Sequence, residues 1–381
     1  MVEILIAATS VVVWLYLIAA RGGFWLSAER DGSGPTPGAW PDVIAVIPAR
    51  NEAEGVGDTV GSLLRQAYPG NFSVVLVDDQ STDGTAEVAR RAAAGSENRL
   101  AVLSGKPLPA GWTGKLWAMK QGVEEASTRT PKYLLFTDAD IVYETDALTR
   151  LVSEAESKSL VLNSLMVKLR CESFAERMLI PAFIFFFQML YPFAWANRSA
   201  AATAAAAGGC MLARRDALQA AGGIEGIRGA LIDDCTLAAS MKRQGPIRLS
   251  LTDRVRSIRG YPDFQDIRRM VARSAYAQLR YSPLLLAGMV IGMALVYLAP
   301  VAFTVFGHGV AQIAGLVAWV IMAIAFQPTL RFYRLSPLWG LALPAIALVY
   351  LAFTLDSAYQ HALGRGGMWK GRAQANLSGS N

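Results

Sequence analysis

The chain has 381 residues, of which 53% are hydrophobic and only 17% are charged. This balance excludes a protein that is soluble throughout, and it leaves room for one soluble domain together with membrane segments. The formal net charge is +6. Because no basic run interleaved with aromatic residues resembles a nucleic-acid reader, we assign the excess charge to a membrane surface and a diphosphate ligand, and we expect no nucleic-acid partner.

The three cysteines, Cys171, Cys210 and Cys235, are widely spaced and form no Cys-x-x-Cys pair. This spacing indicates neither a disulfide framework nor a zinc site, and it favours reduced thiols. The two histidines, His308 and His361, lie in the hydrophobic carboxyl-terminal third of the chain. We therefore do not expect a histidine base in the soluble part.

The amino-terminal segment is apolar almost without interruption over residues 4–20, which predicts a transmembrane anchor at residues 1–22. A cleaved signal peptide is the alternative, but the segment lacks a basic start and a small-residue cleavage site. Residues 23–41 are rich in Gly, Pro and Ser, so they predict a linker.

Strand and helix signals then alternate. Apolar strands are predicted at residues 43–49, 74–78 and 134–137, with helices at 57–66 and from Asp83 onward. This alternation predicts a doubly wound α/β domain. Each strand stops at polar or acidic residues, as parallel strands do where their carboxyl ends open onto a ligand crevice.

These three strand ends resemble the catalytic domain of family 2 glycosyltransferases, and the likeness extends over residues 42–280. The resemblance implies a GT-A fold, a nucleotide-sugar donor with UDP as the expected nucleotide, and Mg2+ or Mn2+ as cofactor. The motifs at 111–117 (Gly-Trp-Thr-Gly-Lys-Leu-Trp), 208–212 and 232–235 resemble the hopene-associated branch of bacteria. That branch implies a hopanoid acceptor.

The Asp-Ala-Asp motif after the third strand carries the predicted metal site. Asp138 and Asp140 are two residues apart, so on a continuing strand both would face one side and could share a divalent cation. The resemblance assigns nucleotide contact to Asp138 and metal binding to Asp140 together with Asp138. A simple turn cap is the alternative.

Five further residues are predicted to bind the nucleotide sugar. By resemblance these are Pro48 and Ala49 at the end of the first strand, then Glu52 and Asp79, whose carboxylates can accept hydrogen bonds from a base N–H and from ribose hydroxyls. Lys115 follows a glycine in a loop, where it can place a point charge on a phosphate.

Attack by an acceptor hydroxyl needs a base, and without a histidine a carboxylate is the practical choice. Asp233 and Asp234 resemble the Glu-Asp pair of the family, with Asp in the Glu position. Asp234 therefore matches the catalytic base, and Asp233 is a candidate for the donor or acceptor site. A solvated helix start is the alternative.

Three more residues are candidates for the donor or acceptor site. Gly208 and Gly209 are expected to let the backbone approach the donor sugar or the acceptor. Arg273 is the residue that remains of the family's Gln-x-x-Arg-Trp, and it suits either a diphosphate or lipid headgroups. A nucleophilic role for Cys210 is the alternative for the glycine motif, but direct displacement needs no covalent enzyme intermediate.

The region around Arg273 also carries a helical pattern. Arg269, Arg273, Tyr276 and Arg280 fall at helical spacing, which predicts one shared helix face.

Long apolar segments at residues 284–306, 310–326 and 338–354 predict a transmembrane region over 281–356, followed by a polar tail at 357–381. Flanking arginines place the catalytic domain on the cytoplasmic side. Three spans would leave the basic tail outside, so either one segment is re-entrant or the tail is an exception. The aromatic segment at 175–197 predicts an interfacial helix or an acceptor groove.

Taken together, the sequence predicts a multi-pass enzyme of the bacterial inner membrane whose catalytic domain faces the cytoplasm. It would move a sugar from a nucleotide-sugar donor to a hydroxyl of a lipid acceptor, a hopanoid by resemblance, with inversion at the anomeric carbon. A polyprenyl phosphate or another glycolipid is the alternative acceptor. The nonenzymatic alternative is a catalytically silent membrane scaffold.

Overall fold

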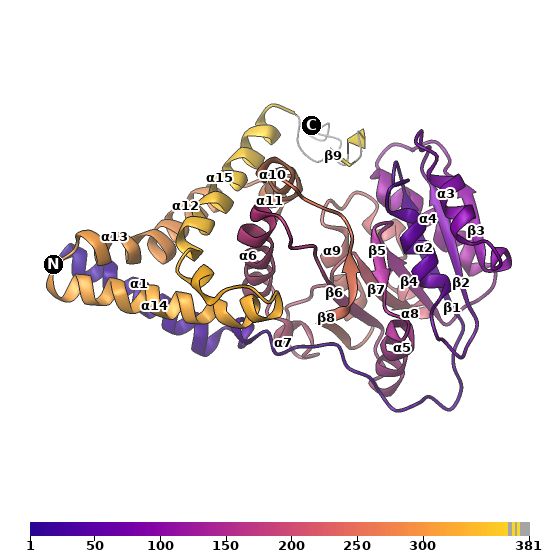
Figure 1. Cartoon of the computed structure of the whole chain (residues 1–381), viewed down its shortest axis with the longest axis horizontal. Helices are drawn as coiled ribbons and strands as arrows, with labels where there is room; N and C mark the ends of the chain where they lie inside the picture. Colours follow the sequence, from indigo (N-terminus) through magenta and orange to yellow (C-terminus); the bar gives the residue numbers. More distant parts are fainter. Residues whose placement is uncertain (365–367, 370–371, 374–381) are drawn as a thin grey trace. The chain divides into compact units, whose positions relative to one another are not determined.

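The structure is a computed structural model that describes residues 1–364, 368–369 and 372–373. The chain divides into two units (Figure 1). Unit 1 is Met1–Ala28, Cys171–Ala194 and Tyr261–Gly366, and unit 2 is Glu29–Arg170, Trp195–Gly260 and Gly367–Asn381. The predicted catalytic domain at 42–280 therefore includes two segments that belong to unit 1.

Unit 2 contains an eight-stranded mixed sheet in the order β3-β2-β1-β4-β7-β6-β8-β5. Strands β3, β2, β1 and β4 run parallel, whereas β7 is antiparallel to β4 and β6. The strands are β1 (Val43–Ala49), β2 (Phe72–Asp78), β3 (Leu100–Ser104), β4 (Tyr133–Thr137), β5 (Ile141–Tyr143), β6 (Leu162–Lys168), β7 (Cys210–Arg214) and β8 (Ile247–Ser257). A separate antiparallel pair joins β9 (Met368–Trp369) to β10 (Arg372–Ala373).

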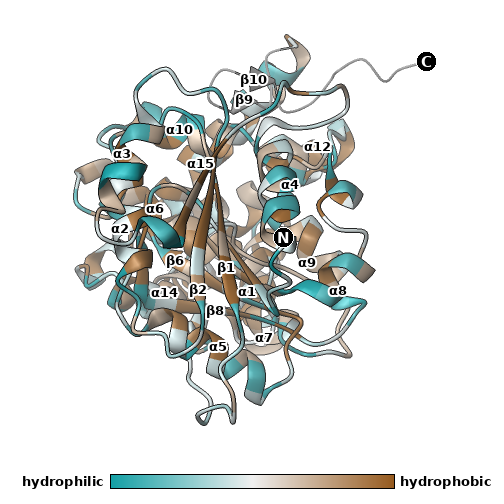
Figure 2. Cartoon of the chain, turned by 90° about the vertical axis from the view of Figure 1, so that its right-hand side faces the viewer, coloured by the Kyte–Doolittle hydropathy of each residue, from teal (hydrophilic) through white to brown (hydrophobic). Residues whose placement is uncertain are grey.

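Helices cover both faces of this sheet. All seven residues of β1 are buried, which requires cover on each side. Ile47 packs in one cluster with residues of α2, α3 and α5, and Val46 packs in another with residues of α4, α8 and α9. Figure 2 shows β1 and β2 as apolar strands at the centre of this arrangement. The helices are α2 (Val56–Leu64), α3 (Thr85–Ala92), α4 (Gly114–Ser127), α5 (Ala147–Ser157), α8 (Arg215–Ala220) and α9 (Asp233–Lys242), with 3-10 turns η2 (Glu97–Arg99) and η3 (Glu225–Ile227).

The loops that follow β1 and β2 hold each other. Asn51 follows β1 and has a φ of 51°, and Gln80 follows β2 and has a φ of 57°. Each strand is thus followed by a residue in the left-handed conformation. The backbone N–H of Asn51 donates to Ser81 Oγ at 2.9 Å, and the side-chain oxygen of Asn51 accepts from the N–H of Thr82 at 2.9 Å. Two strand ends are thereby fixed relative to each other at one edge of the sheet.

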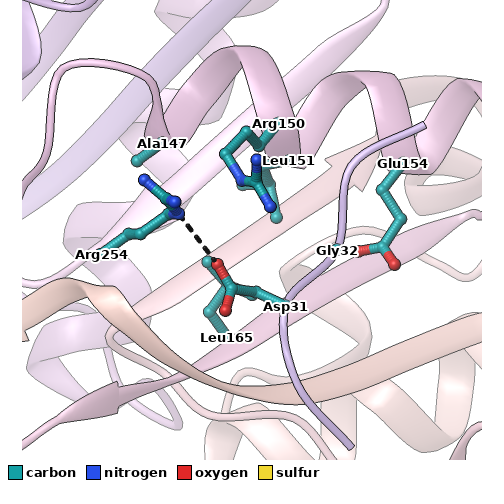
Figure 3. A pocket seen from close by; sticks show the side chains of 8 residues that line it. All are labelled: Asp31, Gly32, Ala147, Arg150, Leu151, Glu154, Leu165 and Arg254. Atoms are coloured by element: carbon teal, nitrogen blue, oxygen red, sulfur yellow. Dashed lines mark ion pairs between the residues drawn. The ribbon is translucent and has the colours of Figure 1, made fainter. Parts of the chain in front are cut away.

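The segment predicted as a linker is in part a piece of unit 2. Glu29–Asp31 runs along β8, where Asp31 N–H donates to Leu251 O and Leu251 N–H donates to Glu29 O, both at 2.9 Å. Asp31 also pairs with Arg254 at 3.7 Å (Figure 3). A small pocket at this junction is lined by Asp31, Gly32, Ala147, Arg150, Leu151, Glu154, Leu165 and Arg254.

Unit 1 is helical. Among the described residues, three helical stretches are long and apolar enough to cross a membrane: Val2–Ala20, Pro283–Phe306 and Gly309–Phe332. The helices are α1 (Val2–Ala20), η1 (Phe24–Leu26), α6 (Phe174–Leu190), α7 (Phe193–Ala196, whose last two residues fall in unit 2), α10 (Phe264–Ala272), α11 (Ala275–Gln278), α12 (Pro283–Met293), the π-helical η4 (Ala294–Leu298), α13 (Ala299–Phe306), α14 (Gly309–Phe332), η5 (Pro337–Gly340) and α15 (Leu343–Ala362).

The apolar segment at 338–354, predicted as a third carboxyl-terminal span, differs from the other two. It is divided between η5 and α15, and α15 is not among the three candidate spans. Asp356 of α15 accepts a hydrogen bond from Arg268 at 2.9 Å. Arg365 and Lys370 of the predicted tail lie outside the described residues.

The aromatic segment predicted at 175–197 consists of α6 and α7, separated by Tyr191 and Pro192. A capping box between Ser173 and Glu176 starts α6, which has 17 residues and is not among the candidate spans. Its interfacial role remains a prediction.

The predicted helix face through Arg273 is not continuous. Helix α10 ends at Ala272, Ser274 has a φ of −126°, and Arg280 has a φ of 52°. Periodicity missed this break because the spacing of the arginines continues across it.

Helix α1 supplies hydrogen bonds to an irregular part of unit 1. The chain is π-helical over Ala294–Leu298. Pro300 follows this turn and has no N–H, so it cannot donate to the carbonyl of Val296, four residues before it. Trp14 Nε1 donates to Val296 O at 2.9 Å, and Ser10 Oγ donates to Leu295 O at 2.7 Å. Helix α1 thus supplies two donors to this turn, and its role as a membrane anchor remains a prediction.

Replacing Trp14 with phenylalanine should lower the free energy of unfolding by about 0.5–2 kcal/mol, because the Val296 carbonyl loses its indole donor. Thermal unfolding of the detergent-solubilised chain measures this. Tyr16→Phe is the control, since Tyr16 lies in the same helix and is 50% exposed. Equal melting temperatures for the two variants would contradict the assigned role of the indole.

Candidate functional site

Lys115 stands between three acids. It lies in the first turn of α4, a helix that begins after Thr113, whose side chain accepts from Leu116 N–H. Its Nζ is 3.0 Å from Asp138 Oδ1 and 3.2 Å from Asp233 Oδ2. Burial disfavours the charged ammonium, but the carboxylates of Asp138 and Asp233 more than offset this and raise the pKa of Lys115. The lysine is therefore a fixed cation at this site.

Asp234 lies beside this lysine in the first turn of α9. Its Oδ2 accepts from Gly208 N–H at 3.0 Å and its Oδ1 accepts from Cys235 N–H at 2.7 Å. Burial, followed by the charge of Asp233, raises the pKa of Asp234 to about 6 although Lys115 opposes the shift. A carboxylate with this pKa can exchange a proton near neutral pH.

The two glycines differ in their surroundings. A Cβ on Gly208 would lie 3.3 Å from Lys115 Nζ and 3.6 Å from Asp234 Oδ2, so this glycine keeps space free around the site. A Cβ on Gly209 would lie 3.0 Å from two carbons of Val167, and its carbonyl accepts from Thr137 Oγ1 at 2.9 Å. Gly209 therefore allows the backbone to pack closely against Val167.

Arg259 is a site residue that the sequence analysis missed. Its Nε donates to Asp140 Oδ2 at 2.7 Å, and its Nη2 donates to both carboxylate oxygens of Glu52 at 2.7 and 2.9 Å. Both acids together raise the pKa of Arg259 against the effect of burial. Arg259 lies just beyond the end of β8 at Ser257, and a single arginine after a strand gives no sequence signal of its role.

The Asp-Ala-Asp motif does not continue a strand, because β4 ends at Thr137. Asp138 pairs with Lys115 through Oδ1, while Asp140 uses Oδ2 to accept from Arg259 and from Ser257. Among the described residues, none donates a hydrogen bond to the other oxygen of either carboxylate. The expectation of two side chains on one strand face is thus replaced by two acids in the β4–β5 connection.

This donor set fits Mg2+ or Mn2+. Two carboxylate oxygens suit a hard cation that keeps several waters and takes further ligands from a substrate's phosphates. In the described part of the chain, no group of three or more His, Cys, Asp or Glu side chains forms a cage for a metal. A metal at Asp138 and Asp140 would therefore need oxygens from a diphosphate.

The predicted nucleoside-binding residues lie at the ends of β1 and β2. Asp79 is fully buried, with Arg50 Nη1 at 3.8 Å from its Oδ2. Pro48 and Ala49 are buried in β1, and the Ala49 carbonyl accepts from Asp79 N–H at 2.8 Å. Glu52 pairs with Arg259, so the two acids have different basic partners.

Two other candidates stand apart from this cluster. Cys210 is fully buried, and burial raises the pKa of its thiol to about 12, which opposes a nucleophilic role. Arg273 belongs to unit 1, so its role toward a diphosphate or lipid remains a prediction.

Comparison with known proteins shows which family the domain is similar to. Residues 44–222 match the family described as Glycosyl transferase family 2. The 4,4'-diaponeurosporenoate glycosyltransferase of Staphylococcus aureus is 36% identical over 110 residues, which are 29% of this chain and 27% of that enzyme. The matched stretch thus spans about a quarter of the relative's own length.

A solved structure shares the fold. The mannosyltransferase PcManGT from Pyrobaculum calidifontis, in complex with GDP-Man and Mn2+, aligns with a TM-score of 0.58 at 19% identity, covering 95% of this chain and 99% of that one. The predicted α/β GT-A fold is confirmed. The hopene-associated branch stays a prediction.

Replacing Lys115 with methionine should destabilise the chain by about 1–3 kcal/mol at pH 8, because three carboxylates lose their shared cation. Burial already raises the pKa values of Asp138 and Asp234 in the folded chain, and loss of the lysine raises them further. The variant therefore loses stability as the pH rises and these acids ionise. The difference in stability between wild type and variant should be smaller at pH 5.5 than at pH 8. Melting temperatures at the two pH values measure it.

Lys115→Arg is the control, since it keeps the positive charge. A loss of stability that is the same at pH 5.5 and pH 8 would show that the lysine acts through packing.

Proposed function

We propose that this chain, which carries a family 2 glycosyl transferase domain, transfers a sugar from a nucleotide-sugar donor to a hydroxyl group of a lipid acceptor at a membrane. The observation that carries the proposal is the buried carboxylate of Asp234, with a pKa of about 6, beside the cation of Lys115. A proton acceptor and a phosphate-binding charge are thereby close to each other. A membrane scaffold without catalytic activity would require neither a base nor a phosphate-binding cation at this position.

The donor would lie along the carboxyl ends of the strands. Glu52 and Asp79 would bind the nucleoside, uridine by resemblance, and Lys115 would bind a phosphate oxygen of the diphosphate. When bound at Asp138 and Asp140, Mg2+ or Mn2+ would neutralise the charge that develops on the leaving nucleoside diphosphate. Lys115 supplies part of the same stabilisation from a charge that is already in place.

The acceptor step uses Asp234. Its carboxylate takes the proton of the acceptor hydroxyl as the oxygen forms a bond to the anomeric carbon. The bond from that carbon to the diphosphate oxygen breaks, and the electron pair leaves with the nucleoside diphosphate. A single in-line displacement inverts the anomeric carbon. The backbone N–H of Gly208 holds Asp234 Oδ2 at 3.0 Å for this step.

The acceptor is a lipid in this proposal, with a hopanoid as its specific form. Three helices that could cross a membrane support an acceptor in the bilayer. The relative named for 4,4'-diaponeurosporenoate supports an apolar acceptor, but that compound is a carotenoid acid. A carboxylate or a polyprenyl phosphate is already ionised and needs no base, so the buried Asp234 favours a hydroxyl.

The proposed topology follows from the arginines that flank the candidate spans. Arg21 follows α1, Arg280 precedes α12, and Arg331 and Arg334 lie at the end of α14. The positive-inside rule puts all of them on the cytoplasmic side, as for an enzyme of the bacterial inner membrane. If α15 does not cross, the basic tail stays on that side too, which removes the conflict that three carboxyl-terminal spans create.

The function is tested by turnover of the detergent-solubilised chain with Mg2+ or Mn2+, a panel of nucleotide sugars and hydroxylated hopanoids. Mass spectrometry of the lipid fraction should show a gain of one sugar. Nucleotide release without a hopanoid product would move the acceptor to another lipid. No donor binding at all would overturn the proposal in favour of the scaffold.

Asp234→Asn should lower turnover about 100- to 10,000-fold while donor binding stays largely intact, because it removes the base and keeps the shape. In the wild type, kcat/KM should fall below an apparent pKa of about 6, since protonated Asp234 cannot accept a proton. Initial rates between pH 5 and pH 8 measure both effects. Glu87→Gln, on an exposed side chain of α3, is the control. Near-normal turnover of the asparagine variant would indicate an ionised acceptor.

Asp140→Asn should weaken the binding of UDP in the presence of Mn2+ about tenfold or more, because a neutral amide is a poor ligand for a hard cation. Calorimetry with and without the ion separates metal-dependent from metal-independent binding. Asp58→Asn, an exposed acid of α2, is the control. Affinity that does not change with Mn2+ in the wild type would rule out the metal role.

A further inference from the structure

Arg259 links the two acids that are predicted to bind different parts of the donor, Glu52 the nucleoside and Asp140 the metal at the diphosphate. One guanidinium reaches Asp140 at 2.7 Å and both oxygens of Glu52 at 2.7 and 2.9 Å. The side chains of Glu52 and Asp140 are only 13% and 12% exposed, whereas that of Arg259 is 34% exposed. Arg259 is thus the solvent-facing member of a largely buried triad.

Strand β8 fixes the arginine and Asp140 together. The backbone N–H of Ile258 donates to Asp140 O at 2.9 Å, and Ser257 Oγ lies 3.2 Å from Asp140 Oδ2. The Oδ2 atom is therefore held from two sides, which leaves Oδ1 as the oxygen for another ligand. A cation on Oδ1 would lie within a few ångströms of the guanidinium on Oδ2.

Two cations this close repel each other unless an anion lies between or beside them. In the absence of a donor, the charge of Asp140 is already balanced by Arg259, so a divalent cation gains little. A diphosphate brings new negative charge that can satisfy both the cation and the guanidinium. The same arginine should thus oppose the metal when the site holds no nucleotide and tolerate it when the diphosphate is present.

We propose that Arg259 couples metal binding to donor binding, by balancing the charge of Asp140 and Glu52 until a divalent cation arrives together with a diphosphate. The proposal rests on the proposed function, and it makes Arg259 a positioning residue for the metal–nucleotide pair. The coupling is reciprocal, so the ion strengthens nucleotide binding by the same factor as the nucleotide strengthens ion binding. The ion alone binds weakly.

The experiment measures Mn2+ binding to the full-length, detergent-solubilised chain, with and without UDP, from the electron paramagnetic resonance signal of the free ion. GDP serves as a second nucleotide probe. Arg259→Met removes the charge and keeps an unbranched side chain, and Arg259→Gln is a second neutral variant if the first does not fold. Arg259→Lys keeps the charge. The matched control is Arg256→Met, in strand β8 shortly before Arg259; the Arg256 side chain is 60% exposed and pairs with Glu144.

Loss of the charge should tighten binding of Mn2+ alone about tenfold and shrink the effect of UDP on that binding by a similar factor. The lysine variant should stay within about threefold of the wild type, and the Arg256 control should not change. A residue that only positions Asp140 would give the opposite sign, since its loss would weaken the metal site. Unchanged or weaker Mn2+ binding in both neutral variants would overturn the inference.

Nucleotide binding by the wild type distinguishes failure of the Arg259 inference from failure of the proposed function. UDP or GDP binding that improves with Mn2+, together with unchanged coupling in Arg259→Met, would leave the glycosyltransferase in place and remove the role of Arg259. A wild type that binds neither nucleotide with any added ion would overturn both.

Discussion

Charge balance at the carboxyl ends of the strands is the constraint on which this site depends. In the proposed function, acids hold a cation and a nucleoside there, yet the donor is itself an anion. Each acidic group therefore has a basic partner in the structure: Arg50 beside Asp79, Lys115 between Asp138 and Asp233, and Arg259 between Glu52 and Asp140. Without these partners, buried or partly buried negative charges would stand uncompensated and destabilise the fold.

The sheet order explains how these partners meet. Strand β4 ends beside β7, which returns antiparallel and places Gly208 near Lys115 and Asp234. Strand β8 pairs with β6 and β5, and its end delivers Arg259 to Asp140. Strand β8 runs in the same direction as β4, so its carboxyl end, followed by Arg259, lies at the same edge as the end of β4. Strand β7 runs the other way, and it brings its amino end, with Gly208, to that edge.

The parts of this arrangement that are local in sequence could be predicted from it. Buried runs that stop at acids are visible as β1, β2 and β4, because burial on both faces gives continuous apolar residues. Arg259 could not be assigned, since its partners are 119 and 207 residues away and a single arginine after a strand has no distinctive pattern.

Two differences between the predicted and the observed helices have local causes that the spacing of residues does not reveal. The third carboxyl-terminal apolar segment, at 338–354, starts inside the 3-10 turn Pro337–Gly340, and its α-helix begins only at Leu343. The helix through Arg273 breaks although its spacing is regular, because Ser274 leaves helical geometry. In both cases a few backbone angles decide the outcome, while the average composition of the segment stays the same.

The hydrogen bonds from α1 to the π-helical turn also constrain how the chain is made. Ser10 and Leu295 are 285 residues apart, so the first helix leaves the ribosome long before its partner exists. During that interval most of unit 2 is synthesised and can fold, because domains generally form as units from the amino terminus. The first helix is therefore made long before Trp14 and Ser10 can donate to the turn. Assembly of unit 1 is a late event in synthesis, and an unrelated helix in place of α1 would lack the donors for that event.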